Sequence, residues 1–132
     1  MDRRQFLTVA LALPVMVMLR TEQKAADQVV IDQQSFLLQE SPIAGFHYYD
    51  GELVFYDLYP GLALQLKREP SNYRDQNAIE IYCALGKLGY VPKSANTTLA
   101  QMMDQGVNLK AELTQLTESA DSWEMARFKV WV

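Results

Sequence analysis

The stretch "LKREPSNYRDQNAIEIY", residues 66–82, decides the fold predicted for this chain. Its two ends are apolar, and its middle is a run of charged residues, asparagines and a proline. Proline favours tight turns because its ring fixes one backbone angle, and Asn and Asp do so because their side chains bond to nearby backbone N–H groups. The run therefore predicts a polar hairpin between two strands. It also gathers enough hydrogen-bonding groups to be a candidate ligand contact.

The segments on both sides of this run alternate between apolar and polar residues, which is typical of strands with one buried face. The residues predicted to face inward are Leu62, Leu64, Leu66, Ile79 and Ile81. Glu80 and Tyr82 are predicted to lie on the opposite face.

Four further segments are predicted as strands. Residues 51–59 are rich in strand-forming side chains and follow an Asp-Gly turn. Residues 87–93 contain a short strand that ends at a proline. Residues 107–116 alternate again, with Val, Leu and Ala facing inward. The aromatic residues of 122–132 predict a last strand that is covered, at least in part, on both faces.

One segment has helical periodicity. Residues 94–96 supply cap candidates, Leu99, Met102 and Met103 form an apolar stripe, and Gly106 ends the pattern. Many short strands with so little helix predict a mainly β domain with one or two helices, folded as a small barrel or a strongly bent sheet.

The composition is that of a folded domain without a strong charge. The chain has 132 residues, of which 49% are hydrophobic and 21% charged, and its formal net charge is −4. A mildly acidic protein has no general attraction for nucleic acid, so phosphate binding would need a local basic patch. The basic residues that could form it are Lys67, Arg68 and Arg74, extended by Lys87 and Lys93. The alternative is that these are solvated charges, with Arg68 paired to Glu69 or Asp75.

The residues that usually carry metals and covalent catalysis are scarce. Cys83 is the only cysteine and His47 the only histidine. This leaves too few ligands for a zinc site and no orienting partner for a nucleophile, so we expect no metal, no cofactor and no enzymatic activity. Cys83 lies in a predicted strand and is expected to be a small core residue.

The N-terminus has the parts of an export signal. Arg3 and Arg4 precede an apolar run, residues 6–19, whose 14 residues fall short of the roughly 20 needed to cross a bilayer as a helix. "RRQFL" also resembles the twin-arginine export signal of bacteria. We therefore expect residues 1–26 to be a signal peptide or membrane anchor, 27–34 a linker and 35–132 the domain.

Two alternatives to a cleaved signal peptide stay open. The apolar run could be retained as an anchor that contacts the membrane, or it could be a buried N-terminal helix. Cleavage near residue 26 would remove more basic than acidic residues and leave a more acidic domain. The expected location is the periplasm or the periplasmic side of the membrane, and the alternative is the cytoplasm.

Three motifs in the body of the chain occur in a fixed order. They are Gly-x-x-Tyr-Tyr-x-Gly at residues 45–51, Arg-Glu-Pro followed by Asp-x-Asn-Ala-Ile at residues 68–79, and Gly-Tyr-Val-Pro at residues 89–92. Over about residues 41–116 the chain resembles the HIRAN domain, which occurs in DNA-repair remodelling proteins and as a stand-alone bacterial domain. The resemblance implies an OB-like β-barrel with helices packed on it.

The resemblance also implies a function and a site. Eukaryotic HIRAN domains bind single-stranded DNA, prefer a free 3′ end and hydrolyse nothing themselves. Carried onto this chain, Tyr48 and Tyr49 would be the aromatic pair of the pocket. Asn72 and Asp75 would be its polar contacts. Aromatic rings stack on any base, and a carboxylate accepts a bond from a terminal hydroxyl but repels a phosphate.

At three positions this chain departs from the DNA-binding members of the family. His47 stands where they have an arginine, Arg74 where they have a tyrosine, and Tyr90 where they have a histidine. The predicted nucleic-acid-binding residues are His47, Tyr48, Tyr49, Lys67, Arg68, Asn72, Arg74, Asp75 and Tyr90.

Each candidate has a structural alternative. Adjacent strand residues point to opposite faces, so one of the two tyrosines would be a core residue and the other a surface residue. Asp75 and Asn77 could instead bond to their own loop and fix the hairpin. The alternative function is an exported binding or scaffold module of the same fold, with a protein or envelope ligand and no DNA binding.

Overall fold

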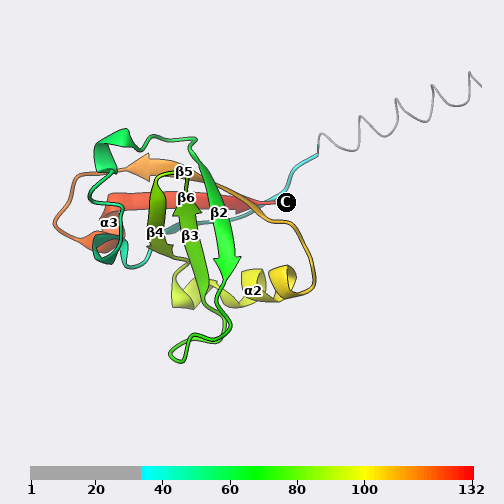
Figure 1. Ribbon diagram of the computed structural model, residues 1–132. Helices are drawn as coiled ribbons and strands as arrows, with labels where there is room; N and C mark the ends of the chain where they lie inside the picture. The colour runs from blue at the N-terminus through cyan, green and yellow to red at the C-terminus, as the bar shows by residue number, and fades with distance from the viewer. Residues whose placement is uncertain (1–33) are drawn as a thin grey trace, which may run out of the picture. The chain divides into compact units, whose positions relative to one another are not determined.

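Six antiparallel strands form one curled sheet in the computed structural model, which describes residues 34–132 (Figure 1). Their order across the sheet is β1-β6-β5-β2-β3-β4. The strands are β1 (Leu37–Pro42), β2 (Ala63–Arg68), β3 (Ile79–Cys83), β4 (Gly86–Tyr90), β5 (Lys110–Leu116) and β6 (Ala126–Trp131). The sheet is a half-barrel, which confirms the predicted OB-like fold class.

A short bridge brings the far edge of the sheet back to its beginning. Ala44, just after β1, exchanges two backbone hydrogen bonds with Tyr90 at the end of β4, at 2.8 and 2.9 Å. Gly89 makes this approach possible, because a Cβ atom there would collide with the carbonyl oxygen of Ala44, and because its φ of +152° disfavours other residues. The bridge positions Tyr90 beside the segment that follows β1.

The helical elements are short. They are η1 (Phe46–Tyr48), η2 (Phe55–Asp57), η3 (Lys93–Ala95), α2 (Thr97–Asp104) and α3 (Ser122–Met125). The predicted helix is confirmed as α2, which buries Leu99 and Ala100 and is followed by Gly106 at φ +90°. In Figure 1 the loop between β2 and β3 projects from the lower end of the sheet, beside α2.

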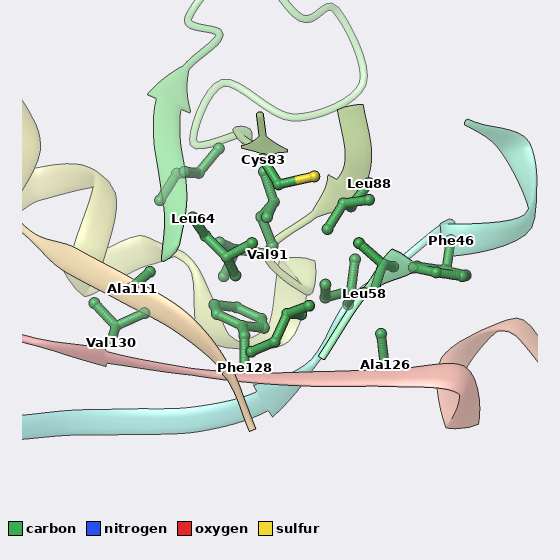
Figure 2. Close-up of a cluster of buried hydrophobic side chains, with 14 of the residues drawn as sticks. Phe46, Leu58, Leu64, Cys83, Leu88, Val91, Ala111, Ala126, Phe128 and Val130 are labelled. Carbon is green, nitrogen blue, oxygen red and sulfur yellow. The ribbon is translucent and has the colours of Figure 1, made fainter. Parts of the chain in front are cut away.

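The core lies inside the curl of the sheet (Figure 2). Phe128 and Val130 from β6 meet Leu64 from β2 and Leu88 from β4, and Phe46 closes one end. The predicted inward faces of β2, β3 and β5 are confirmed, since Leu64, Ile79, Ile81, Ala111 and Leu113 are buried. Cys83 is also a buried core residue, as predicted.

The predicted strand at 51–59 is wrong. The segment forms local turns and η2, with hydrogen bonds from Asp57 N–H to Val54 O and from Leu58 N–H to Phe55 O. Strand-forming residues favour strands only where a neighbouring strand can pair with them. Here β4 pairs with β3 and not with residues 51–59. Asp50, just before the segment, bonds to β4 through its backbone N–H, which donates to Lys87 O at 3.0 Å.

One further prediction needs correction. Residues 122–125 form α3 rather than the start of the last strand, and Trp123 is 61% exposed. The strand begins only at Ala126, where pairing with β5 begins. Glu80 and Tyr82 lie on one face of β3, as predicted, where the Tyr82 hydroxyl donates to Glu80 and Glu80 is buried beside Lys87.

The predicted signal peptide or anchor, residues 1–26, lies outside the described residues, as does nearly all of the predicted linker. Within residues 34–132, the structure has no helix with the length and apolar character needed to cross a membrane.

Candidate nucleic-acid interface

A cleft of about 520 Å³ opens where the segment after β1, the end of β4 and the β2–β3 loop meet. Its volume falls in the range of roughly 300–1,000 Å³ that is usual for small-ligand sites. It is lined by Ala44, Tyr49, Asn72, Arg74, Asp75, Ala78, Tyr90, Val91 and Lys93. The structure thus brings together five of the predicted site residues, which come from three separate motifs of the sequence.

The loop between β2 and β3, residues 69–78, is called the site loop below. It is built from successive tight turns, in which the N–H groups of Asn72, Asp75 and Ala78 each donate to the carbonyl three residues earlier. A bond from Glu69 N–H to Ala78 O, at 2.9 Å, closes the loop onto the β2–β3 hairpin. The predicted polar hairpin is therefore confirmed.

Two side chains of the site loop bond to its own backbone. Asn72 Oδ1 accepts from the N–H groups of Arg74 and Asp75, at 2.9 and 3.2 Å. Asp75 Oδ1 accepts from the N–H of Asn77 at 3.0 Å. These Asx turns show that part of the loop's polarity is structural, which is the alternative that the sequence left open.

The Asp75 carboxylate keeps capacity for a ligand. Its second oxygen, Oδ2, accepts from Asn96 Nδ2 at 2.7 Å. Each carboxylate oxygen has two lone pairs, so each can accept one more hydrogen bond. Asn72 has spare capacity too, because only one bond is found for its amide nitrogen, to Glu69 Oε1 at 2.7 Å.

Two tyrosines form the aromatic wall of the cleft. The rings of Tyr49 and Tyr90 meet edge to face, with centroids 5.8 Å apart and planes at 61°. The ammonium of Lys87 lies 4.2 Å from the Tyr49 centroid and 4.3 Å from the Tyr90 centroid. Cation–π attraction to both rings holds the pair in place. Tyr90 Oη also bonds to Glu69, which links the wall to the site loop.

Lys87 and Glu80, behind this aromatic wall, stabilise each other's charged forms. Lys87 Nζ lies 3.2 Å from Glu80 Oε2 and donates to Tyr90 Oη at 3.0 Å. Burial lowers the pKa of Lys87, but its bonds to Tyr90 and Glu80 raise that pKa by more, above its usual value. Burial raises the pKa of Glu80, yet the hydrogen bond from Tyr82 and the Lys87 ammonium bring it below the usual value. At neutral pH these groups are therefore an ammonium and a carboxylate.

Tyr90 stays an uncharged phenol at neutral pH. Burial raises its pKa most, the bond from Lys87 opposes this, and the bond to Glu69 adds to it. The wall therefore presents neutral rings to the cleft.

Four of the nine predicted residues do not line the cleft, namely His47, Tyr48, Lys67 and Arg68. Tyr48 is 84% exposed and does not line it, whereas the half-buried Tyr49 does, so the two tyrosines face different ways although neither lies in a strand or in the core. The His47 ring contacts the Glu52 carboxylate and the carbonyl of Ala120, and its backbone N–H donates to Ser122 Oγ. These contacts hold His47 against the start of α3.

Arg68 has a structural position rather than a phosphate-facing one. Its guanidinium pairs with Asp104 of α2, with Nε 2.9 Å from Oδ1, and not with Glu69 or Asp75 as one alternative predicted. It also donates to the carbonyls of Ala78 and Gln76 at 2.7 and 3.0 Å. Its partners lie far along the chain, which is why local sequence did not identify them. The neighbouring Lys67 is exposed and does not line the cleft.

Lys93 lines the cleft although it was predicted only as an extension of the patch. Its ammonium donates to the Arg74 carbonyl at 3.3 Å, which places it at the mouth beside Arg74. The sequence feature that could have identified Lys93 as a cleft residue is its position directly after Gly-Tyr-Val-Pro, where the chain leaves β4. Across residues 34–132 the structure has no group of three or more His, Cys, Asp or Glu residues placed to hold a metal ion.

Solved structures of other proteins share this fold. A crystal structure of a protein from Lactobacillus plantarum is 30% identical, covers 74% of this chain and 94% of its own, and gives a TM-score of 0.64. The HIRAN domain of human HLTF is 22% identical, covers 74% of this chain and 78% of its own, and gives a TM-score of 0.55. A comparison with curated proteins gave no match.

The model of the HIRAN domain family matches residues 36–132, which includes every element described above. The chain therefore belongs to the HIRAN domain family, a family of DNA-binding domains.

Proposed function

We propose that this chain is a non-catalytic module that binds single-stranded DNA at a free 3′ end. The observation that carries the proposal is the cleft, because one concave surface combines aromatic rings, two cations and a carboxylate with unused acceptor capacity. These are the three kinds of group that a terminal nucleotide needs, for its base, its phosphate and its terminal hydroxyl.

Each group of the cleft has a role in this proposal. The terminal base stacks against the Tyr49–Tyr90 wall, which binds without sequence preference because every base has a π-face. Arg74 and Lys93 at the mouth attract the phosphate that precedes the last nucleotide. Asp75 accepts a hydrogen bond from the 3′-hydroxyl. The binding is local, because the net charge of −4 gives no general attraction to DNA.

The proposal is tested by fluorescence anisotropy with two short oligonucleotides that differ only in a 3′-hydroxyl or a 3′-phosphate. Low salt is used because the electrostatic contribution to binding is largest there. We expect the 3′-hydroxyl oligonucleotide to bind at least about fivefold more tightly, since two unit charges 4 Å apart in water repel by roughly 1 kcal/mol. A hairpin with its 3′ end base-paired is the control and should bind weakly.

Two results would count against the proposal in different ways. Equal affinity for the two ends would remove Asp75 from its role. No binding of any oligonucleotide at low salt would leave the alternative, a module of the same fold with a protein or envelope ligand.

We also propose that the module works outside the cytoplasm, either released into the periplasm or anchored on the periplasmic side of the membrane. The support is the paired arginines before the apolar run at residues 6–19. Cell fractionation combined with sequencing of the mature N-terminus tests this. We expect a cut or membrane-bound protein in the wild type and cytoplasmic retention when Arg3 and Arg4 are both changed to Lys. An uncut wild-type protein in the cytoplasm would contradict the proposal.

A further inference from the structure

We infer that Asn96 is a positioning residue that aims the Asp75 carboxylate into the cleft and thereby sets the preference for a free hydroxyl end. The inference rests on the proposed function, which it deepens. It assigns a role in recognition to a residue that does not line the cleft and lies 21 positions from its partner.

Asn96 does not use its side chain as its position would lead one to expect. It is the N-cap residue of α2, and an asparagine there normally accepts a hydrogen bond from the first turn of the helix. Here no such bond forms, although the Asn96 carbonyl accepts from Ala100 N–H at 2.8 Å. The amide is turned toward the site loop instead, where it donates to Asp75 Oδ2 at 2.7 Å.

Asn96 is 1% exposed, so its end of the contact is buried, whereas Asp75 is half-buried and lines the cleft. A buried amide without a hydrogen-bond partner is costly, so losing this bond costs more than losing one on the surface. The two residues just before Asp75 are, by contrast, open to solvent, because Tyr73 is 88% exposed and Arg74 is also exposed. Asn96 is thus a buried anchor beside the exposed tip of the loop.

The neutrality of this partner favours a role in recognition over one in stability alone. Asp75 forms no ion pair within residues 34–132, and its side-chain partners are an amide and a backbone N–H. A lysine or arginine in place of Asn96 would also orient the carboxylate but would offset its charge. An amide fixes the direction of the carboxylate and leaves its negative charge, which is what repels a terminal phosphate and attracts a hydroxyl.

The main test is Asn96→Ser, because serine is a favoured N-cap residue that supports α2 but is too short to bond to Asp75. The measured quantity is the ratio of Kd for a 3′-phosphate oligonucleotide to Kd for the 3′-hydroxyl oligonucleotide. We expect this ratio to fall at least threefold from the wild-type value. Asp75→Asn should lower it as well, and the double variant should lower it no further than Asp75→Asn does, because both changes act on one contact.

A core variant separates this effect from simple destabilisation. Val130→Ala removes buried volume on β6, far in sequence from the site loop, and should lower the melting temperature while leaving the ratio at its wild-type value. A readout on the wild-type chain needs no variant. The side-chain NH₂ resonances of Asn96 should shift when a 3′-hydroxyl oligonucleotide binds, and should shift less with a 3′-phosphate oligonucleotide at equal saturation.

The failures of the inference and of the proposed function are distinguishable. A wild-type ratio near one, or no binding, overturns the proposed function and the inference together. A wild-type ratio well above one that persists in Asn96→Ser but is lost in Asp75→Asn overturns the inference alone. Unchanged Asn96 side-chain resonances at saturation with the 3′-hydroxyl oligonucleotide would also overturn it.

Discussion

The curled sheet and the site loop lie next to each other in this domain but are held by different forces. The sheet is stabilised by apolar side chains buried inside its curl, with Phe128 at the centre. The site loop buries little apolar surface and is held by hydrogen bonds to itself, to Tyr90 and to α2. Burying one large apolar side chain contributes about 1.5–3 kcal/mol, whereas one hydrogen bond contributes about 0.5–1.5 kcal/mol net.

This difference separates stability from recognition. Changes in the sheet should lower the free energy of unfolding without altering which DNA end binds. Changes in the site loop should alter which DNA end binds and leave the free energy of unfolding nearly unchanged. The exception is a side chain such as Arg68, which ties the loop to the rest of the domain.

The largest loss of stability should come from Phe128→Ala. The side chain is fully buried in a core to which strands β2 to β6 all contribute, so its removal leaves a cavity and should cost about 3–5 kcal/mol of unfolding free energy. Urea denaturation measures this. The remaining folded protein should keep the wild-type preference between 3′ ends. A loss below 1 kcal/mol would show that the sheet does not depend on this core.

Arg68→Ala should be next, with a loss of about 1–3 kcal/mol, because it removes the guanidinium bonds to two carbonyls of the site loop and to the Asp104 carboxylate. DNA affinity should also fall, since the loop loses its link to the end of α2. Lys67→Ala is the matched control, one residue away and exposed, and should change stability by less than about 0.5 kcal/mol. Equal stability of the two variants would contradict the structural role of Arg68.

Tyr90 and Lys87 link the site loop to Glu80 of the sheet, and the contribution of Glu80 to stability should depend on pH. The pKa of Glu80 is lowered on folding, so its charged form stabilises the native state above its unfolded pKa, about 4.3, and this stabilisation is lost as pH falls through the folded value. Glu80→Gln should be less stable than wild type at pH 7. The difference should shrink as pH falls from 5 to 2. A constant difference across that range would exclude Glu80 as its source.

The smallest effect on stability, and a clear one on binding, is expected for Arg74→Ala. The side chain is exposed, and its bond to Tyr73 and its contact with the Tyr73 ring lie at the surface. Unfolding free energy should therefore change by less than about 0.5 kcal/mol. Loss of one phosphate contact should reduce the slope of log K against log salt by about 0.7 for a single strand. An unchanged slope would mean that Arg74 does not face the DNA.

Much of the fold could be predicted from sequence because local patterns determine it. Alternation identified β2, β3 and β5, the spacing of Leu99 and Met103 identified α2, and turn-forming residues identified the site loop. The segment 51–59 was misread because its strand-forming residues have no neighbouring strand to pair with. No strand was predicted specifically at β1, whose first residues are exposed and give no clean alternation.

The site was only partly predictable, for a related reason. Family motifs identified Tyr49, Asn72 and Asp75, all of which line the cleft. They could not show which tyrosine of the pair turns inward. Nor could they show that Arg68 meets Asp104, 36 residues away, or that Asn96 meets Asp75, because such contacts depend on how distant segments pack.

The adjacent tyrosines provide the most direct test of the claim that this cleft holds a DNA end. Tyr49 lines the cleft and Tyr48 does not, although the two are neighbours with identical side chains. The measurement is the Kd for a 3′-hydroxyl oligonucleotide with Tyr49→Ala and with Tyr48→Ala. Tyr49→Ala should weaken binding by about 1–3 kcal/mol, the usual value of a base–aromatic stack, and Tyr48→Ala should leave Kd unchanged within twofold. A larger loss with Tyr48→Ala, or no loss with either variant, would contradict the account.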